Sequence, residues 1–243
     1  MANIDIVIPV GPNDMNHVEV VVDCCKKNLK FRKIFLICFD NVNIDGCEFI
    51  SEDIFPFSKT DVSKLHGENP RNGWYLQQLL KLYAGTVIPG ILNDYVVIDC
   101  DTFVLKPIEF VENGKYLFNT SDEYHSPYFV HMNKLHPSLK KVSYSSGITH
   151  HMIFSTSILN KMFSLVETYH GNIHPFWYIF LDCVDLSLRR VNTSGASEYE
   201  LYFNYMLLYH SNLTKIRNLD WQDCGTVNLN ADKDYISVHW WLR

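Results

Sequence analysis

The sequence VVIDCDTFVLKP, Val96 to Pro107, carries the clearest structural pattern of the chain. The apolar run Tyr95–Ile98 leads directly into Asp99, Cys100 and Asp101. A short run that is apolar on both faces is typical of a strand in a parallel sheet, because helices cover both faces of such a sheet. Ligands of open α/β sheets bind beyond the carboxyl ends of the strands. The segment therefore predicts both a central strand and the place of a ligand site.

Strand and helix patterns alternate on both sides of this segment. Further strands are expected at Ile4–Val10, Lys33–Phe39, Tyr116–Asn119, His151–Phe154 and Tyr235–Trp241. Helices are expected at Asn16–Leu29, Asn72–Ala84, Thr156–Tyr169, Phe176–Leu188 and Ser197–Tyr209. This alternation predicts an α/β fold with a mostly parallel central sheet and flanking helices. Residues 1–243 are expected to form one domain, with a nucleotide-binding half at about 1–105 and a half that shapes the substrate site at about 106–243.

The composition excludes several classes of protein. Hydrophobic residues make up 47% and charged residues 20% of the chain, which is a globular and not a disordered composition. The formal net charge of −6 argues against nucleic acid as a partner. No apolar run approaches the roughly 18 residues of a membrane span. The seven scattered cysteines without a CxxC pair, and the lack of a visible secretory signal, predict reduced thiols and a cytoplasmic location.

Asp99 and Asp101 are the first candidates for chemistry. Positions i and i+2 of an extended chain point the same way, so both carboxylates are expected to face one small volume. Two such close carboxylates repel each other unless a cation lies beside them. Oxygen ligands of this kind suit Mg²⁺ or Mn²⁺, which usually share their site with substrate phosphates. The alternative is that the two aspartates only cap the loop after the strand.

The helix that begins at Asn72 adds candidates for anion binding. Trp74, Gln77 and Lys81 share one face of it, and Arg71 precedes it. Arg71 and Lys81 could offset the charge of a diphosphate. The alternative is a helix face that water covers.

Two histidines stand side by side in GITHHMIF, residues 147–154. Adjacent residues on a strand point to opposite faces, so His150 and His151 make a poor chelate. We expect one of them to pack in the core and the other to face a site.

The segment SEYELYFNY, residues 197–205, begins with a capping box of Ser197 and Glu200. We interpret Glu200 as a cap and Glu198 as free to act as a general base or to recognise a hydroxyl. At the other end of the chain, His239 could complete a metal site or contact a phosphate. The alternative for His239-Trp240-Trp241 is that it anchors the last strand to the core.

Five segments occur here in one order: RNGWYLQQLLKL, VVIDCDTFVLKP, GITHHMIF, SEYELYFNY and the closing HWW. In that order they resemble a family of small GT-A-type glycosyltransferases with a DxD motif, known from bacterial polysaccharide clusters and from large DNA viruses. The resemblance spans most of the chain. It implies a GT-A-like fold, in which a Rossmann-type nucleotide-binding half is merged with an acceptor-binding half.

The resemblance also implies roles for individual residues. A divalent cation, Mn²⁺ or Mg²⁺, would be held by Asp99, Asp101 and His239. The nucleotide sugar would contact Pro9, Val10, Gly11, Arg71, Trp74, Gln77, Lys81, Asp99 and Cys100. The acceptor would contact His150, His151 and Trp240. The catalytic carboxylate would be Glu198, with Asp182 as the weaker candidate.

The function that this resemblance implies is transfer of a hexosyl or deoxyhexosyl group. The donor would be a nucleoside-diphosphate sugar, with uridine diphosphate as the expected carrier, and the acceptor a hydroxyl of a glycan or glycoprotein. For a viral protein, the expected location would be the host cytoplasm.

Three alternatives remain open. A haloacid-dehalogenase-like phosphohydrolase also starts from a strand that ends in DxD, but Phe103 stands where Thr or Val is expected, and Asp182 and Asp185 have the wrong spacing for its second acidic pair. A nucleotidyltransferase would carry a Gly- and Arg-rich loop after the first strand, which VGPNDMN lacks. A non-catalytic carbohydrate-binding protein would also suit the 14% of aromatic residues.

Overall fold

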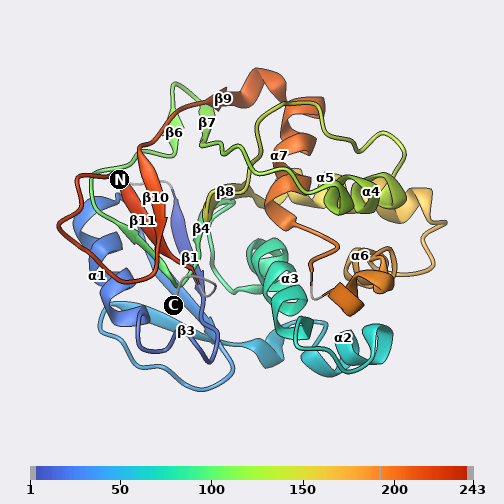
Figure 1. Ribbon diagram of the computed structural model, residues 1–243, viewed down its shortest axis with the longest axis horizontal. Helices are drawn as coiled ribbons and strands as arrows, with labels where there is room; N and C mark the ends of the chain where they lie inside the picture. The colour runs from blue at the N-terminus through green and yellow to red at the C-terminus, as the bar shows by residue number, and fades with distance from the viewer. Residues whose placement is uncertain (1–3, 192, 240–243) are drawn as a thin grey trace.

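The computed structural model describes residues 4–191 and 193–239. Its central sheet has the strand order β3-β2-β1-β4-β8 (Figure 1). The strands are β1 Asp5–Pro9, β2 Ile34–Cys38, β3 Cys47–Ser51, β4 Asp94–Ile98 and β8 His151–Ser155. The first four run parallel, and β8 runs antiparallel to β4. The predicted α/β fold with a mostly parallel sheet is confirmed.

Burial explains why these segments form the middle of the sheet. Every residue of β1 and β2 is buried, as are Tyr95 to Ile98 of β4. Such continuous burial requires helices on both faces of the sheet. Among these buried strand residues, Asp5 carries a charge. Its carboxylate accepts hydrogen bonds from Arg32 Nε at 3.0 Å and from Arg32 Nη2 at 2.6 Å. This bidentate pair compensates the charge at the start of β1.

The expected helices are present. They are α1 Val18–Asn28, α3 Asn72–Val87, α5 Thr156–Tyr169 and α7 Glu198–Tyr209. The central sheet runs between α1 on the left and α3 on the right in Figure 1, and α3 contacts β1, β4, α5 and α7. All residues from Glu198 to Met206 are buried, as are Gln78 to Ala84. Helices buried on all sides belong to the interior, so α3 and α7 carry side chains toward the centre of the molecule.

The sequence patterns missed the short and polar elements. The missed strands are β3, β5 Thr102–Val104, β6 Val111–Glu112, β9 Thr214–Ile216 and β10 Trp221–Cys224. The missed helices are α2 Lys59–His66, α4 Ser126–Leu135 and the short 3-10 helices η1 Glu52–Ile54 and η3 Ser211–Leu213. These strands have two to five residues, too few for a clear alternation of polar and apolar positions.

The helix expected over Phe176–Leu188 ends early. Helix α6 covers Phe176–Asp182, and a 3-10 helix, η2, follows at Leu186–Val191. The carboxylate of Asp185 accepts a hydrogen bond from the backbone N–H of Ser187 at 3.0 Å. This local bond starts a new turn and competes with continuation of the helix.

Two small sheets accompany the central one. One has the order β10-β11-β5 and the other β6-β7-β9, where β7 is Lys115–Phe118 and β11 is Tyr235–Val238. Strand β11 is antiparallel to β5, which begins directly after Asp101. The pairing brings the end of the described chain to the carboxyl end of β4. The expected strand over Tyr235–Trp241 therefore ends at Val238, and Trp240 and Trp241 lie outside the described residues.

Strands from both expected halves meet in this fold, since β8 belongs to the central sheet and β5 pairs with β11. The boundary near residue 105 stays a prediction. All seven cysteines carry free thiols. Within residues 4–191 and 193–239, no helix has the length and apolar character needed to cross a bilayer.

Candidate functional site

The candidate site begins in the turn that follows β4. Thr102 N–H donates to the carbonyl of Asp99 at 2.9 Å, so Asp99 to Thr102 form a turn and not the extended chain that we expected. Asp99 N–H donates to the carbonyl of His150 at 2.9 Å, which ties this turn to the residue before β8. Asp99 Oδ2 lies 3.9 Å from His150 Nδ1. The turn thus presents its carboxylates to a histidine from the neighbouring strand.

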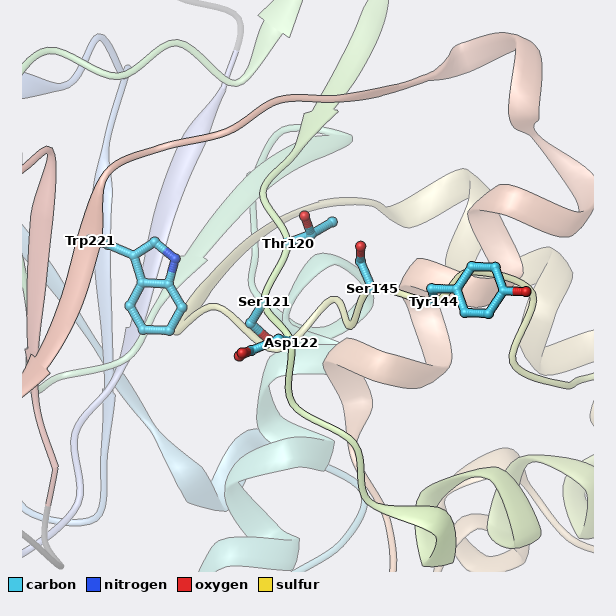
Figure 2. A pocket seen from close by; sticks show the side chains of 6 residues that line it. All are labelled: Thr120, Ser121, Asp122, Tyr144, Ser145 and Trp221. Atoms are coloured by element: carbon cyan, nitrogen blue, oxygen red, sulfur yellow. The ribbon is translucent and has the colours of Figure 1, made fainter.

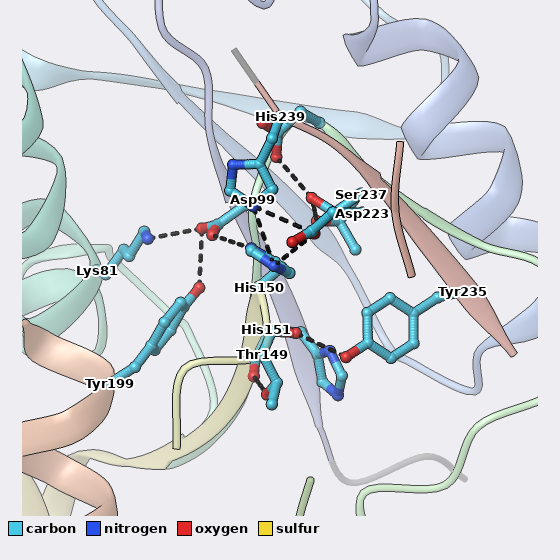
Figure 3. A network of polar contacts seen from close by, with 12 residues as sticks. Lys81, Asp99, Thr149, His150, His151, Tyr199, Asp223, Tyr235, Ser237 and His239 are labelled. Atoms are coloured by element: carbon cyan, nitrogen blue, oxygen red, sulfur yellow. Dashed lines mark hydrogen bonds and ion pairs between the residues drawn. The ribbon is translucent and has the colours of Figure 1, made fainter. Parts of the chain in front are cut away.

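The other oxygen of Asp99 is held by two side chains from helices. Asp99 Oδ1 lies 2.6 Å from Lys81 Nζ and accepts a hydrogen bond from the hydroxyl of Tyr199 at 2.8 Å (Figure 3). Lys81 comes from α3 and Tyr199 from α7. The ammonium of Lys81 also lies 4.3 Å from the centroid of the Tyr199 ring. These contacts fix the orientation of the Asp99 carboxylate.

Lys81 has a second acidic partner in Glu198. Its Nζ lies 2.6 Å from Glu198 Oε1, and both side chains are only 4% exposed. Burial by itself lowers the pKa of Lys81, but the charges of Asp99 and Glu198 and the hydrogen bonds to them outweigh it and raise the pKa. Burial raises the pKa of Glu198, although the charge of Lys81 opposes this change. Lys81 therefore remains an ammonium that two carboxylates share.

This arrangement changes the interpretation of Glu198. The side chain is bound to Lys81, and its backbone N–H donates to Gln78 Oε1 at 3.0 Å. The expectation that Glu198 is free for other contacts is not met, because it is the buried counter-ion of Lys81.

Glu200 also differs from our expectation, since its carboxylate does not serve only as a helix cap. It accepts hydrogen bonds from Ser146, Gly147 and Lys141, while Ser197 Oγ caps the N–H of Glu200.

A cluster of two histidines and an aspartate lies next to Asp99. His150 Nε2 is 3.2 Å from Asp223 Oδ1 and 3.1 Å from His239 Nε2. His239 Nε2 is 3.4 Å from Asp223 Oδ1. Figure 3 shows these three side chains converging from the segment before β8, from β10 and from the end of β11. Each offers one ligand atom, and these atoms all lie within 4.8 Å of one another.

Charge stabilises this cluster. Burial lowers the pKa of His150, but the hydrogen bond to Asp223 and the charges of Asp99, Asp223 and Asp101 raise it overall. Burial raises the pKa of Asp223, but the hydrogen bond and charge of His150, together with the charge of His239, lower it overall. The negative charges of Asp223, Asp99 and Asp101 around His150 thus favour a positive charge at this position.

The donor set fits a divalent cation. Imidazole nitrogens and carboxylate oxygens bind transition metals at about 2.0–2.2 Å, so ligand atoms on one ion lie about 3 Å apart. The three ligand atoms here lie 3.1, 3.2 and 3.4 Å from one another. Of the three residues expected to bind metal, His239 belongs to the cluster. Asp99 lies beside it, and Asp101 Oδ1 lies 3.4 Å from Ser237 Oγ of β11. The metal roles of Asp99 and Asp101 stay predictions.

The two adjacent histidines have separate environments. His150 has a φ of +64° and precedes β8, which turns its side chain into the cluster. His151 is the first residue of β8, and its ring packs edge-on against Phe110 and Tyr235. Burial lowers its pKa well below the usual value. The structure therefore places His151 in the core and His150 among the candidate metal ligands, and the acceptor roles expected of both stay predictions.

The residues expected near the nucleotide lie at the same edge of the sheet. Strands β1 and β4 are neighbours, so Pro9, Val10 and Gly11 lie beside the turn that contains Cys100. Gly11 is partly exposed, whereas Cys100 is 1% exposed and its thiol lies 3.7 Å from the carbonyl of Asp14. The Cys100 side chain is thus part of the core.

The α3 residues are spread along the helix. Lys81 reaches the site, whereas Arg71 lies ten residues earlier, which is about 15 Å along the axis. Trp74 and Gln77 are partly buried between them. Asp182 is exposed at the end of α6, which packs against α2 and is not brought to the β4 turn. Trp240 lies outside the described residues.

A groove adjoins the cluster. It has a volume of about 630 Å³ and is lined by Thr120, Ser121, Asp122, Tyr144, Ser145 and Trp221 (Figure 2). The indole of Trp221 stacks on Tyr235 with ring centroids 5.4 Å apart, and it meets the His150 ring edge-on at 5.2 Å. Trp221 thus connects the groove with the metal-ligand candidates.

Sequence reasoning missed several of these residues. They are Gln78, Tyr199, Trp221, Asp223 and Ser237. Gln78 lies three residues before Lys81 in α3, so helical spacing offered a signal for it, whereas no spacing marked Tyr199. Asp223 lies in the short strand β10, and no local pattern marked it.

The structure resembles the crystal structure of mouse xyloside xylosyltransferase 1 in its apo form, with a TM-score of 0.48 and 9% sequence identity, over 99% of this chain and 98% of that one. A comparison with curated protein sequences gives no match. The model of a family of unknown function, DUF6492, matches residues 14–236. The chain therefore belongs to the DUF6492 family.

Proposed function

We propose that this chain is a metal-dependent glycosyltransferase that moves a sugar from a nucleoside-diphosphate sugar to a hydroxyl of a glycan or glycoprotein. One observation carries the proposal. The aspartate turn at the carboxyl end of β4 lies against His150, Asp223 and His239, whose ligand atoms are within 4.8 Å of one another. A cation site at this edge of a parallel sheet is suited to a ligand that carries phosphates.

The three clustered residues would hold the cation, with Asp99 and Asp101 beside them. When bound, it would supply a Lewis acid that balances the negative charge of the diphosphate as the bond to the sugar breaks. Two imidazole ligands favour Mn²⁺ over Mg²⁺, since nitrogen is a better ligand for transition metals than for Mg²⁺.

Lys81 and its partners would keep the site organised. With Asp99 Oδ1 bound by Lys81 and Tyr199, Oδ2 is left on the side of His150. Glu198 holds the other side of the ammonium. We infer that Glu198 acts as a positioning residue and that its effect on turnover passes through Lys81. Such support is needed because the groups of an active site must be held close to their productive geometry.

In the proposed reaction, the bond between the anomeric carbon and the phosphate oxygen breaks, and its electron pair stays on the diphosphate. The acceptor oxygen forms a bond to the anomeric carbon, and its proton is released to bulk water. Because negative charge develops on the diphosphate as the bond breaks, the cation site would stabilise the leaving group.

The first experiment is isothermal titration with uridine, guanosine, cytidine, adenosine and thymidine diphosphates, with Mn²⁺ and then with a chelator. We expect one nucleotide to bind only with metal, and His239→Ala to abolish this binding. His174→Ala, at an exposed position, is the control for the loss of a histidine. Nucleotide binding that ignores the chelator, or no binding at all, would refute the proposal and favour a carbohydrate-binding protein or a phosphohydrolase.

A further inference from the structure

We propose that the groove between Trp221 and Tyr144 binds the acceptor, and that this acceptor is a neutral oligosaccharide of at least two sugar rings. The transfer role of the groove rests on the proposed function, whereas carbohydrate binding by the groove can be tested without it.

The position of the groove links it to the reaction centre. Trp221 and Asp223 are two residues apart in β10, so both side chains lie on the same face of that strand. The Trp221 ring also contacts the ring of His150. A ligand that touches Trp221 therefore lies next to the candidate metal ligands, which is where the acceptor hydroxyl must arrive.

The lining has the chemistry of a carbohydrate site. Figure 2 shows the two aromatic side chains, Trp221 and Tyr144, at opposite ends. The residues between them offer three hydroxyls and one carboxylate; they are Thr120, Ser121, Asp122 and Ser145. Sugar rings combine apolar C–H faces with hydroxyl groups that both donate and accept hydrogen bonds, so they match aromatic and hydroxyl groups together. A ligand that contacts both aromatic ends spans more than one ring.

Charge distinguishes the acceptor from the donor here. The lining contains Asp122 and no cation among its six residues, and the exposed Glu123 follows directly. A diphosphate would be repelled from such a surface. The groove is therefore suited to a neutral ligand, and the donor diphosphate belongs on the other side of the cluster, toward Lys81 and β1.

A buried carboxylate builds the wall of the groove. Glu200 is 1% exposed, and its Oε2 accepts from Ser146 Oγ at 2.6 Å and from Gly147 N–H at 3.0 Å. Ser121 and Ser146 exchange two backbone hydrogen bonds of 3.0 and 2.9 Å. Both walls are thus tied to helix α7 before any ligand binds. Such preorganisation lowers the entropic cost of binding a flexible glycan.

The test uses the whole chain on an array of immobilised neutral and uronate-containing oligosaccharides, with free peptides as a second panel, in the absence of nucleotide. We expect retention on neutral glycans, with disaccharides bound at least fivefold more tightly than the matching methyl monosaccharides. Asp122→Asn is expected to raise binding of uronate-containing glycans at least fivefold, because the repulsion is removed. Tyr144→Ala is expected to remove the preference for disaccharides. Because Tyr144 is fully exposed, its replacement is not expected to destabilise the fold.

Trp221→Ala is expected to abolish retention, whereas Trp221→Phe keeps the stacking on Tyr235 and retains part of it. Trp177→Phe on α6 and Asp23→Asn are the matched controls, and neither is expected to change binding. Retention of peptides alone, no retained glycan, or glycan binding that these groove variants leave unchanged would each overturn the inference. The nucleotide titration is independent of the groove, so metal-dependent nucleotide binding without glycan binding rejects the groove alone. Glycan binding without nucleotide binding rejects the transferase alone.

Discussion

The ammonium of Lys81 lies 2.6 Å from the carboxylate of Asp99. The lysine comes from the buried helix α3 and the aspartate from the turn after β4, so this ion pair joins the middle of a helix to the edge of the sheet. Glu198 of α7 occupies the other side of the ammonium at 2.6 Å. One buried cation thus connects three parts of the fold at the candidate site.

Replacing this cation should have a large effect on stability. Lys81→Met is expected to lower the free energy of unfolding by about 3–5 kcal/mol, because two carboxylates lose their shared partner. In the double variant Lys81→Met with Glu198→Gln, one of these charges is removed, so the loss is expected to be smaller than the sum of the single losses. Urea unfolding measures all four proteins. Additive losses would contradict a direct coupling of Lys81 and Glu198.

Glu198→Gln also separates positioning from catalysis. As a positioning residue, Glu198 should affect turnover through Lys81, so Lys81→Met and the double variant should have the same kcat. A catalytic Glu198 would make the double variant slower than Lys81→Met. Steady-state kinetics of donor turnover, with nucleotide affinity as the control, distinguishes these outcomes.

Loss of Asp223 should weaken metal binding without loss of the fold. Asp223→Asn is expected to lower Mn²⁺ affinity at least tenfold, since the cluster loses its carboxylate ligand. The electron paramagnetic resonance signal of free Mn²⁺ measures this affinity. Asp23→Asn is the control, and unchanged affinity in Asp223→Asn would remove this residue from the metal site.

The hydrogen bonds that the Glu200 carboxylate accepts and the helix cap by Ser197 should make separate contributions to stability. Ser197→Ala is expected to lower the free energy of unfolding by about 1 kcal/mol, which is typical of an N-cap. Glu200→Gln should lower it by more, about 2–3 kcal/mol, because the hydrogen bonds of a buried charge to Ser146, Gly147 and Lys141 are weakened. Equal losses would mean that Glu200 serves only the helix end.

A substitution at Gly147 measures how closely the groove wall packs against helix α7. A Cβ at this position would lie 2.7 Å from Cγ of the buried Phe203, so Gly147→Ala is expected to lower the free energy of unfolding by about 1–3 kcal/mol. Gly73→Ala is the control, because its Cβ would meet no atom within 4 Å and alanine favours the helix. Thermal unfolding compares the two variants. An unchanged stability of Gly147→Ala would show that the groove wall can accommodate the added Cβ.

His131 should make the protein less stable in mild acid. It is 2% exposed in α4 and donates from Nε2 to the carbonyl of Phe180 at 2.8 Å, and burial lowers its pKa to about 4. The unfolded chain binds a proton near pH 6.5, so the folded state loses stability as the pH falls from about 6.5 to about 4, by about 3 kcal/mol in total.

The check is chemical unfolding at several values of pH. His131→Gln cannot take up this proton, so its stability should depend less on pH across that window than the stability of the wild type. The same change at the exposed His174 controls for the loss of a histidine. Identical pH profiles of His131→Gln and wild type would show that this imidazole does not titrate on unfolding.

The order of the main elements was predictable because burial of whole strands and helices leaves a strong local pattern. Tyr95 to Ile98 is apolar throughout, and the structure makes it a central strand. Helix α3 was predicted from apolar residues at helical spacing, and α7, which is buried on all sides from Glu198 to Met206, from the cap at Ser197. Short segments such as β10 carry no such pattern, because their conformation depends on the strand that they pair with.

The same contrast holds for the site. Local patterns in the sequence were enough to predict the strand before Asp99 and the long helices, because these segments carry apolar runs, helical spacing or caps of their own. The fold was needed to show that Asp223 and His150 meet His239, that Lys81 binds Asp99 and Glu198, and that His151 lies in the core. These contacts join residues up to 117 positions apart, as between Lys81 and Glu198. The pairing of β5 with β11 and the positive φ of His150 bring His239 and His150 together, and neither is encoded in the spacing of neighbouring residues.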